Sequence, residues 1–457
     1  MAFFRSLLAT TALLSAYSNA EGVQGTAFGF ASGTTGGGDA SPAAPSDIAE
    51  LKSWLSDDTP RVILIDKEFN FLGTEDTCDD CECCIPDSNS CGSSGQNAIK
   101  TDGSDWCGNY PTTTCTYDNA GLEGLTVASD KSIVGVGSAG VLRGKGLRLT
   151  SGVENIIIQN IHITELNPQY IWGGDAITLD GTDKIWIDHV KVSLVGRQMF
   201  VSGYDSSGSV TISNSEFDGR TSWSASCDGH HYWSVLGYGK NDKVTFANNY
   251  IHHTSGRSPK VEFANHWHAY NNYWYNNTGH AFDVGENSNV LIEGNVFAQV
   301  DTPSEPDSGK VFAVTSSDQS ACKSALGRNC VANSLVSSGN LTTSDQSVLS
   351  NWPSDEGKAD VMDVSKVASY VVANAGVGKL GGSASASSTV GAASSATPSA
   401  SASMVKRFGL PFVPAYSQAG PGTSSMPALP SFTWKTVGTP KPTLPAPAGF
   451  GSQPQAF

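Results

Sequence analysis

The sequence carries little charge for its length. Asp, Glu, Lys and Arg make up 15% of its 457 residues, whereas hydrophobic residues make up 39% and glycine contributes 49. Charged helix formers are therefore scarce, which argues against a helix bundle and favours a turn-rich all-β protein. The charge is also unbalanced, with 27 basic against 43 acidic residues and a net charge of −16. Such a chain is not expected to bind nucleic acid or another dense polyanion through a broad basic surface.

The sequence also lacks an apolar run long enough to cross a membrane, which takes about 20 residues. Its first apolar run, residues 7–14, follows Arg5 and precedes the small residues Ser18-Asn19-Ala20. A basic start, a short apolar stretch and a small-residue end are typical of a cleaved secretory signal. We therefore expect a signal peptide over residues 1–20, an extracellular protein and no membrane attachment.

Paired C-x-x-C blocks and paired histidines of a zinc site are missing, although the chain has ten cysteines. Seven of them fall between Cys78 and Cys115, and the close spacing of Cys81, Cys83 and Cys84 only superficially suggests zinc. In a protein routed to an oxidising compartment, cysteines more often form disulfides. We expect a disulfide-stapled loop here and no metal.

An eight-residue motif recurs along the middle of the chain. Its first and third positions are mostly β-branched or aromatic, its eighth is large and apolar, and the start-to-start spacings are 29, 25, 34, 23 and 23 residues. The copies are IIIQNIHI (156–163), IWIDHVKV (185–192), VTISNSEF (210–217), VTFANNYI (244–251), WHAYNNYW (267–274) and VLIEGNVF (290–297). A period of this length indicates a solenoid, here a single-stranded right-handed parallel β-helix with loop insertions.

The fifth position of the motif is polar or glycine in every copy. It reads Asn160, His189, Asn214, Asn248, Asn271 and Gly294. Alternating residues followed by a polar corner predict a strand that bends into the next face, and we expect the stacked Asn side chains to hydrogen-bond from coil to coil. A β-sandwich has similar short strands but no fixed register of Asn. We interpret His189 as a structural member of this series, and Trp186 and Trp274 as packing residues.

Composition changes near Leu380, where Ser, Ala, Gly and Pro take over. Such a segment cannot bury enough apolar surface to offset its ordering entropy. We therefore divide the chain into a signal peptide (1–20), a β-helical catalytic domain (21–380) and a disordered tail (381–457).

Four charged residues stand out against this background: Asp175 in WGGDAITL, Arg197 in VGRQMF, and Arg257 with Lys260 in TSGRSPK. On adjacent coils they would converge on one face of the solenoid. The strings WGGDAIT, WIDHVKVSLVGRQ, CDGHHYWSV, HTSGRSPKVE and GHAFDVGE…EGNVF resemble fungal-type pectin lyases of the pectate lyase superfamily, in family order, from about residue 23 to 380. The tail falls outside the resemblance.

The resemblance implies a β-helix whose cleft binds methyl-esterified galacturonan and cleaves it by β-elimination. It assigns Arg257 as the base, Lys260 and Arg197 as cations lining the site, and Asp175 as the nearby acid, whose role is to orient Arg197 rather than to react. Arg197 takes the place of the calcium of related pectate lyases, so no cofactor is expected. Without the resemblance, an Arg in such a turn is more often a loop-bracing side chain.

The resemblance also implies features around the site. Aromatic side chains should stack on sugar rings, and these are Trp106, Trp172, Tyr232 and Trp233. Three disulfides are implied, Cys84–Cys107, Cys91–Cys227 and Cys322–Cys330, whereas Cys78, Cys81, Cys83 and Cys115 are additional and leave the connectivity of the loop open. Asn276 and Asn340 lie in glycosylation sequons. A monomer is expected.

Three other functions are compatible with parts of this sequence. A calcium-dependent pectate lyase would need a carboxylate cluster where Arg197 stands. A polygalacturonase would need paired Asp residues, and the N-T-D, R-I-K and repeat-region D-D elements are missing. A non-catalytic, glycan-binding solenoid fits the fold, but the retention of all four charged positions argues against it.

Overall fold

The chain is described by a computed structural model over residues 22–100, 106–305, 307–341, 343–353 and 359–380. The expected signal peptide (1–20) and tail (381–457) lie outside these residues. None of the described helices is long and apolar enough to cross a membrane.

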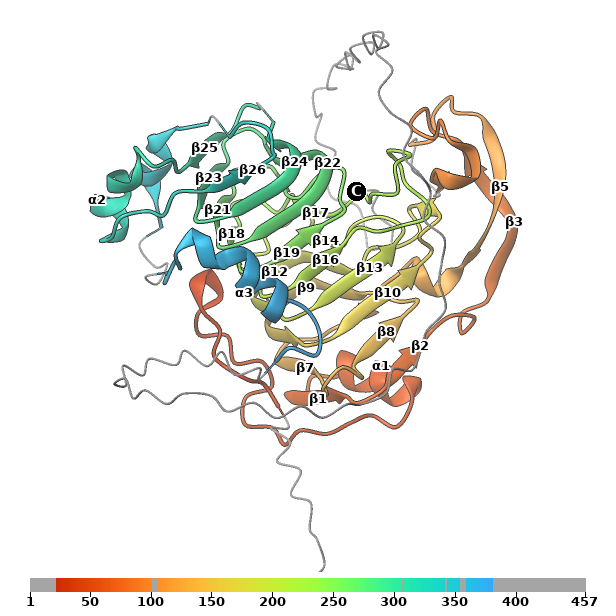
Figure 1. Cartoon of the computed structure of the whole chain (residues 1–457). Helices are drawn as coiled ribbons and strands as arrows, with labels where there is room; N and C mark the ends of the chain where they lie inside the picture. The colour runs from red at the N-terminus through yellow and green to blue at the C-terminus, as the bar shows by residue number, and fades with distance from the viewer. Residues whose placement is uncertain (1–21, 101–105, 306, 342, 354–358, 381–457) are drawn as a thin grey trace, which may run out of the picture. The chain divides into compact units, whose positions relative to one another are not determined.

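The described strands wind into a parallel β-helix, as the repeat predicts (Figure 1). Each full coil gives one short strand to each of three faces, and equivalent strands pair in parallel with the coil before and after. The first face holds β6 (Leu125–Thr126), the start of β9 (Leu147–Gln159), the start of β12 (Ile177–Asp188), β14 (Phe200–Ser202), β17 (Val235–Gly237), β20 (Lys260–Val261) and the end of β22 (Tyr273–Val284).

The other two faces are longer stacks. The second holds β1 (Arg61–Ile65), β7 (Lys131–Gly135), the ends of β9 and β12, β15 (Ser209–Ser213), β18 (Lys243–Ala247), β21 (His266–Tyr270), β23 (Asn289–Glu293) and β25 (Lys310–Ala313). The third holds β2 (Glu68–Asn70), β8 (Val141–Arg143), β10 (His162–Leu166), β13 (Lys191–Val195), β16 (Glu216–Asp218), β19 (Tyr250–His252), the start of β22, β24 (Val296–Ser304) and β26 (Ser334–Val336).

The bend between the second and third faces lies where the sequence places it. All six residues at the fifth motif position are left-handed, with φ from 46° at Asn214 to 62° at Gly294. Asn and Gly adopt this conformation at low cost. His189 is held there by its neighbour, since its Nδ1 lies 2.7 Å from Asp188 Oδ2.

The side-chain ladder, however, belongs mainly to the next residue. Asn249 donates to Asn272, Asn272 to Asn295 and Asn295 to Asn333, with Nδ2–Oδ1 distances of 3.0, 3.0 and 3.1 Å. The expected ladder is therefore displaced by one residue, because the fifth side chain sets the bend while the sixth enters the interior. Satisfying these buried amides fixes the register of one coil on the next.

Apolar side chains fill the coil interior. Trp274 is fully buried there and stacks on Phe297 with ring centroids 4.8 Å apart. Trp186 is buried outside the coil interior, against Ala27 and Ala31 of the N-terminal segment, with its Nε1 donating to Ser213. Both tryptophans are packing residues, as expected. Helix α1 (Ile48–Ser56) covers the β1 end of this core with Leu51 and Leu55 (Figure 1).

Other helices are short or peripheral. Helix α3 (Val364–Asn374) packs Val367 and Val371 against Val296 of β24. The remainder are α2 (Lys323–Leu326) and the 3-10 turns η1 (Gly29–Ala31), η2 (Gly92–Ser94), η3 (Asn119–Gly121), η4 (Gln319–Cys322) and η5 (Gln346–Asn351).

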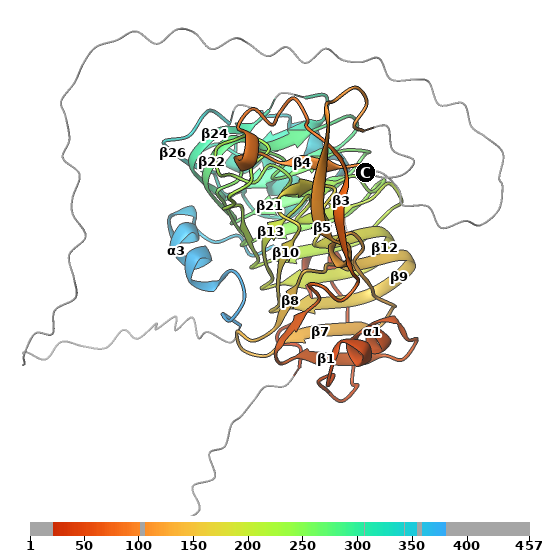
Figure 2. The same cartoon turned by 90° about the vertical axis from the view of Figure 1, so that its right-hand side faces the viewer.

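A small separate sheet contains five of the ten cysteines. Its strands are β3 (Thr77–Cys84), β5 (Thr112–Asp118), β4 (Asn97–Ile99) and β11 (Tyr170–Ile171), with β3 antiparallel to β5 along their length (Figure 2). The structure pairs Cys84–Cys107, Cys91–Cys227 and Cys322–Cys330, the pairs that the resemblance implies, and joins the additional cysteines as Cys78–Cys81 and Cys83–Cys115.

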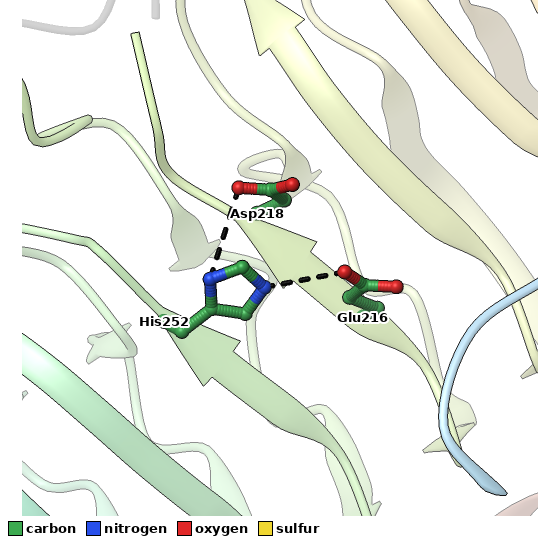
Figure 3. A group of neighbouring side chains, drawn as sticks. All are labelled: Glu216, Asp218 and His252. Atoms are coloured by element: carbon green, nitrogen blue, oxygen red, sulfur yellow. Dashed lines mark hydrogen bonds and ion pairs between the residues drawn. The ribbon is translucent and has the colours of Figure 1, made fainter. Parts of the chain in front are cut away.

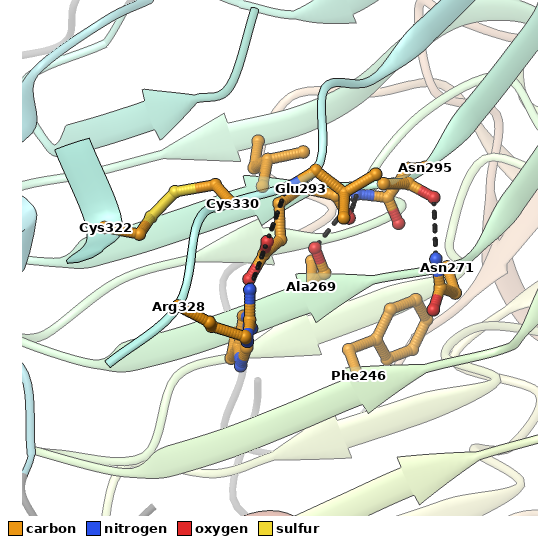
Figure 4. A network of polar contacts seen from close by, with 12 residues as sticks. Phe246, Ala269, Asn271, Glu293, Asn295, Cys322, Arg328 and Cys330 are labelled. Carbon is orange, nitrogen blue, oxygen red and sulfur yellow. Dashed lines mark hydrogen bonds and ion pairs between the residues drawn. A yellow bond between two sulfur atoms is a disulfide. The ribbon is translucent and has the colours of Figure 1, made fainter. Parts of the chain in front are cut away.

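A buried acid stabilises the C-terminal coils (Figure 4). Glu293 is fully buried, and it accepts from Arg328 Nη2 at 2.7 Å and lies 2.8 Å from His268 Nε2. Burial alone would raise the pKa of Glu293, but these two partners bring it down to about 2. Its stabilisation is therefore present above the unfolded pKa near 4.5 and is lost as the pH falls toward 2.

Arg328→Met should lower the free energy of unfolding by about 3 kcal/mol at neutral pH, because it leaves the Glu293 carboxylate buried with too little compensation. The deficit should narrow as the pH falls and Glu293 becomes protonated. Urea denaturation across pH measures both effects. Arg143→Met is the control, since Arg143 pairs with Glu165 and their side chains are 34% and 37% exposed; its cost should stay under about 1 kcal/mol. Equal costs for the two variants would contradict this account.

Candidate active site

The candidate site lies where the chain enters the short strands of the first face. Asp175, Arg197 and Arg257 precede β12, β14 and β20, respectively. The strands are parallel and in register, with Phe200 opposite Val235 and Leu236 opposite Lys260. Their entering ends therefore gather at one edge, and side chains far apart in the sequence become neighbours.

Arg197 is buried at this edge, with 6% of its surface exposed. Its guanidinium carbon lies 3.7 Å from the ring centroid of Trp172, and the described residues offer no hydrogen-bond partner to its Nε. Burial lowers the pKa of Arg197 to about 10; the charge of Arg257 acts in the same direction, and Asp175 opposes it. At neutral pH it remains a cation held against an aromatic face.

Asp175 lies beside this cation. Its Oδ1 accepts from the backbone N of Gln198 at 2.8 Å. Burial raises the pKa of Asp175, whereas the charge of Arg197 and this hydrogen bond oppose the rise. The carboxyl is thus tied to the segment that carries Arg197, a geometry that suits an orienting group.

Arg257 faces two aromatic rings on the neighbouring coil. Its guanidinium carbon lies 4.8 Å from the Trp233 ring centroid and 5.6 Å from that of Tyr232. Its backbone is left-handed, with φ of 45°, and its N–H donates to His280 Nε2 at 3.1 Å. Within the described part of the chain, no carboxylate lies at ion-pair distance from its guanidinium.

Lys260 differs from the two arginines because carboxylates surround it. Its Nζ lies 2.6 Å from Asp283 Oδ2 and 3.1 Å from Glu262 Oε1. Burial alone would lower the pKa of Lys260, but the hydrogen bond to Asp283 raises it above the usual range. Lys260 is therefore a permanent ammonium whose charge is largely compensated, which the sequence pattern did not indicate.

The four aromatics expected to bind sugar form two contacting pairs. Trp106 meets Trp172 edge to face with centroids 6.2 Å apart, and Tyr232 meets Trp233 in the same way at 5.0 Å. The Arg197 guanidinium lies over the Trp172 ring, and the Arg257 guanidinium lies over the Trp233 ring. The structure thus brings all four aromatics and the charged residues into one region. Of the two sequons, Asn340 is exposed and Asn276 is half-buried in β22.

Gln96 and His231 were not singled out from the sequence, yet they connect this region. Gln96 Nε2 donates to the carbonyl of Gly196 at 2.9 Å, and its Oε1 accepts from Trp233 Nε1 at 3.0 Å. His231 Nε2 lies 2.7 Å from the carbonyl of Arg197 and 3.0 Å from that of Trp233. Burial lowers the pKa of His231 to about 4, so it stays neutral near pH 7. Gln96 lies in none of the strings that carry the resemblance, and His231 lies in CDGHHYWSV, but a string does not show what an individual side chain contacts.

Two groups of described side chains have the composition of a metal site. Glu216, Asp218 and His252 form the first, on the third face (Figure 3). Lys191 Nζ already lies 2.8 Å from Glu216 and 3.2 Å from Asp218, so an ammonium supplies the counter-charge. The second group consists of His280, Asp283 and Glu305. There the Lys260 ammonium supplies the counter-charge, since its Nζ lies 2.6 Å from Asp283 Oδ2. Asp175 belongs to neither group.

Known proteins share this architecture and sequence. A family model described as pectate lyase matches residues 91–380. Probable pectin lyase F of Aspergillus niger is 69% identical over 466 residues, covering 100% of this chain and 97% of its own, and its Aspergillus oryzae counterpart is 72% identical over 404 residues, covering 88% and 94%. Probable pectin lyase D of Aspergillus niger is 49% identical and covers 82% and 100%.

Solved structures show the fold. Pectate lyase II of Xanthomonas campestris aligns with a TM-score of 0.50 and 19% identity, covering 77% of this chain and 98% of its own. A mutant of Bacillus subtilis pectate lyase aligns with a TM-score of 0.50 and 16% identity, covering 79% and 98%. Together with the sequence relatives, these matches define the chain as a polysaccharide lyase built on a parallel β-helix. It belongs to the pectate lyase family.

His280 should hold the Arg257 backbone in place through its Nε2 acceptor. His280→Gln can present an oxygen in the same position and should retain most activity, whereas His280→Ala should lower kcat by about tenfold. Burial lowers the pKa of His280, so the neutral acceptor persists below the usual histidine range and activity should fall only in more acidic buffer. A pH profile of kcat tests this. Equal kcat values and profiles for the two variants would argue against a positioning role.

Proposed function

We propose that this protein is a secreted pectin lyase that cleaves the α-1,4 bonds of methyl-esterified polygalacturonan by β-elimination and leaves unsaturated galacturonate ends. The observation that carries the proposal is the buried Arg197 guanidinium, which lies on Trp172 without a described partner at Nε. A buried donor left open beside other cations suits a ligand that brings acceptor oxygens. The relatives named as pectin lyases support the same reading.

The reaction removes the proton on carbon five, next to the ester carbonyl, and expels the O4 leaving group. Negative charge accumulates on the ester oxygens as the proton departs. Arg197 and Lys260 are fixed cations that would stabilise this charge, and their geometry is set before substrate arrives. Asp175 and His231 would act as positioning residues for Arg197.

Arg257 is proposed as the base that removes the proton. An arginine must lose a proton before it can accept one, which is ordinarily unfavourable. Of the two cations on the β20 segment, Lys260 has two carboxylates within 3.1 Å, whereas Arg257 faces aromatic rings. Arg257 is therefore the one whose charged form lacks a compensating carboxylate, which makes it the better candidate.

The ester preference follows from the charge around Asp175. A calcium-dependent reaction on free carboxylates would need several acids to converge there, and Arg197 lies in their place. Secretion, a catalytic unit over residues 21–380 and a monomeric state belong to the same proposal. Five disulfides in the described chain support an oxidising compartment, and the site is assembled within one chain.

The purified protein should release ultraviolet-absorbing unsaturated product from highly esterified pectin, and faster than from de-esterified pectate. A chelator should leave the rate unchanged, because the site uses fixed cations. Product absorbance over time, on both substrates and with or without chelator, measures this. Chelator-sensitive activity with a preference for low ester would instead identify a calcium-dependent pectate lyase.

Arg257→Lys should lose at least about 100-fold in kcat, because the base is removed while a positive charge is kept. Arg143→Lys is the matched control, since Arg143 pairs with Glu165 on the third face, away from the site. Both variants should retain the unfolding midpoint. Wild-type turnover by the Arg257 variant would rule out its assignment as the base.

A further inference from the structure

We propose that Tyr204, Tyr238 and Phe263 form an aromatic platform that binds a methyl-esterified sugar residue beside the one being cleaved. The platform rests on the proposed function, which it extends to a subsite and to the origin of ester preference. None of its three members belongs to the pairs formed by Trp106, Trp172, Tyr232 and Trp233.

Each of the three rings contacts the other two. Tyr204 lies 5.9 Å from Tyr238 and 5.7 Å from Phe263, and Tyr238 lies 5.3 Å from Phe263, between ring centroids. They come from three successive coils, directly after β14, β17 and β20. Neighbouring coils are about 4.8 Å apart, so the platform spans about 10 Å, enough for one to two sugar rings.

Two of the three platform rings are exposed, and the third, that of Tyr238, is half-buried. Tyr204 is 42% exposed and Phe263 is 41% exposed, and they are the two aromatics among the exposed large hydrophobic side chains of the described residues. Exposed aromatic rings scattered singly would need no explanation, but two in mutual contact beside a third mark a binding surface.

Phe263 also has an unfavourable backbone conformation. Its φ is 58°, and that of Ala264 is 64°. A bulky residue in the left-handed region costs about 1 kcal/mol or more and persists where the surroundings hold it. Here the carbonyl of Phe263 accepts from the backbone N of Asn241 at 3.1 Å. Phe263 thus adopts an unfavourable backbone conformation and also keeps an apolar ring at the surface, and neither feature stabilises the fold.

Hydrogen bonds also hold the backbone of the loop that contains Tyr204. Asp242 Oδ1 accepts from the backbone N of Ser207 at 2.6 Å and from that of Gly208 at 3.1 Å. The backbone N of Gly203 donates to Leu179 at 2.6 Å. A surface held this firmly loses little entropy when it binds a ligand.

The platform is continuous with the candidate site. Arg197, Trp233 and Arg257 precede β14, β17 and β20, and the platform follows the same strands, which are two or three residues long. The two sets are five to seven residues apart along the chain and flank the same strands, each of which is at most about 10 Å long. Burial raises the pKa of Tyr238, and the charges of Lys260 and Arg257 oppose the rise, so the phenol lies within their field.

The chemistry of the rings selects an esterified residue. An aromatic face attracts the C–H bonds of a pyranose ring and of a methyl ester. A free carboxylate on the same ring would have to lose water against this surface without a compensating partner, which is costly. The platform thus favours the ester by disfavouring the acid.

Kinetics on purified variants test the platform. Phe263→Asn removes the ring but keeps a residue that tolerates positive φ, and Tyr204→Ala removes the second exposed ring. Each should raise KM on highly esterified pectin by about three- to tenfold with kcat unchanged, and change KM on low-ester substrate less. Phe263→Tyr and Tyr204→Phe, which keep the ring, should behave as wild type. Leu335→Ala is the control for an exposed apolar side chain elsewhere, since Leu335 is 42% exposed.

The outcomes separate this proposal from the proposed function. If the wild-type protein releases no unsaturated product, the proposed function fails and the platform fails with it. If the wild type is active and folded Phe263→Asn and Tyr204→Ala variants keep its KM on both substrates, the platform alone is overturned. Unchanged KM together with a shift in sedimentation would assign the surface to a second copy of the chain, and this also overturns the proposal.

Discussion

Parallel pairing between successive coils is the constraint on which the rest of the structure depends. It places Arg197 and Arg257 at one edge because β14, β17 and β20 are in register. That register is fixed away from the site, by left-handed bends and by buried amides such as Asn249 and Asn272. A slip by one residue would turn the site side chains to the other surface of their strands. The positions of the site residues are therefore set by the bends and buried amides on the other faces of the β-helix.

Gathering cations on one face costs electrostatic energy, and the structure offsets this cost in two ways. Lys260 is neutralised by Asp283 and Glu262, whereas Arg197 is covered by Trp172. A carboxylate pair would satisfy the guanidinium and leave it little to offer a ligand, whereas an aromatic face stabilises the charge and keeps its N–H donors available. In the proposed mechanism, Lys260 therefore supplies a fixed positive charge near the substrate, and Arg197 contacts the substrate directly.

The sequence predicted the β-helix and its bends because these leave a periodic pattern, and it nominated candidate site residues because they lie in extended strings that resemble a family. The eight-residue motif located all six left-handed positions from Asn160 to Gly294. It could not tell which of two adjacent Asn residues, such as Asn248 and Asn249, enters the interior, because a period does not give a side-chain direction. The sequence did not predict the contacts of Gln96, His231 and His280 for another reason. Each of these side chains contacts residues that are distant in the sequence, on other coils or in the disulfide-rich loop.

The two ends of the short strands meet different physical demands. At the entering end, the proposed mechanism needs positive charge close to the developing negative charge, and two arginines, a lysine and their aromatic neighbours lie there. At the leaving end, after β14, β17 and β20, a residue that is not being cleaved has only to be recognised. The proposed platform places neutral rings there, where added cations would attract ionised galacturonate and weaken discrimination between ester and acid. On this proposal, selectivity for the ester depends as much on the absence of charge at the leaving end of the strands as on the cations at the entering end.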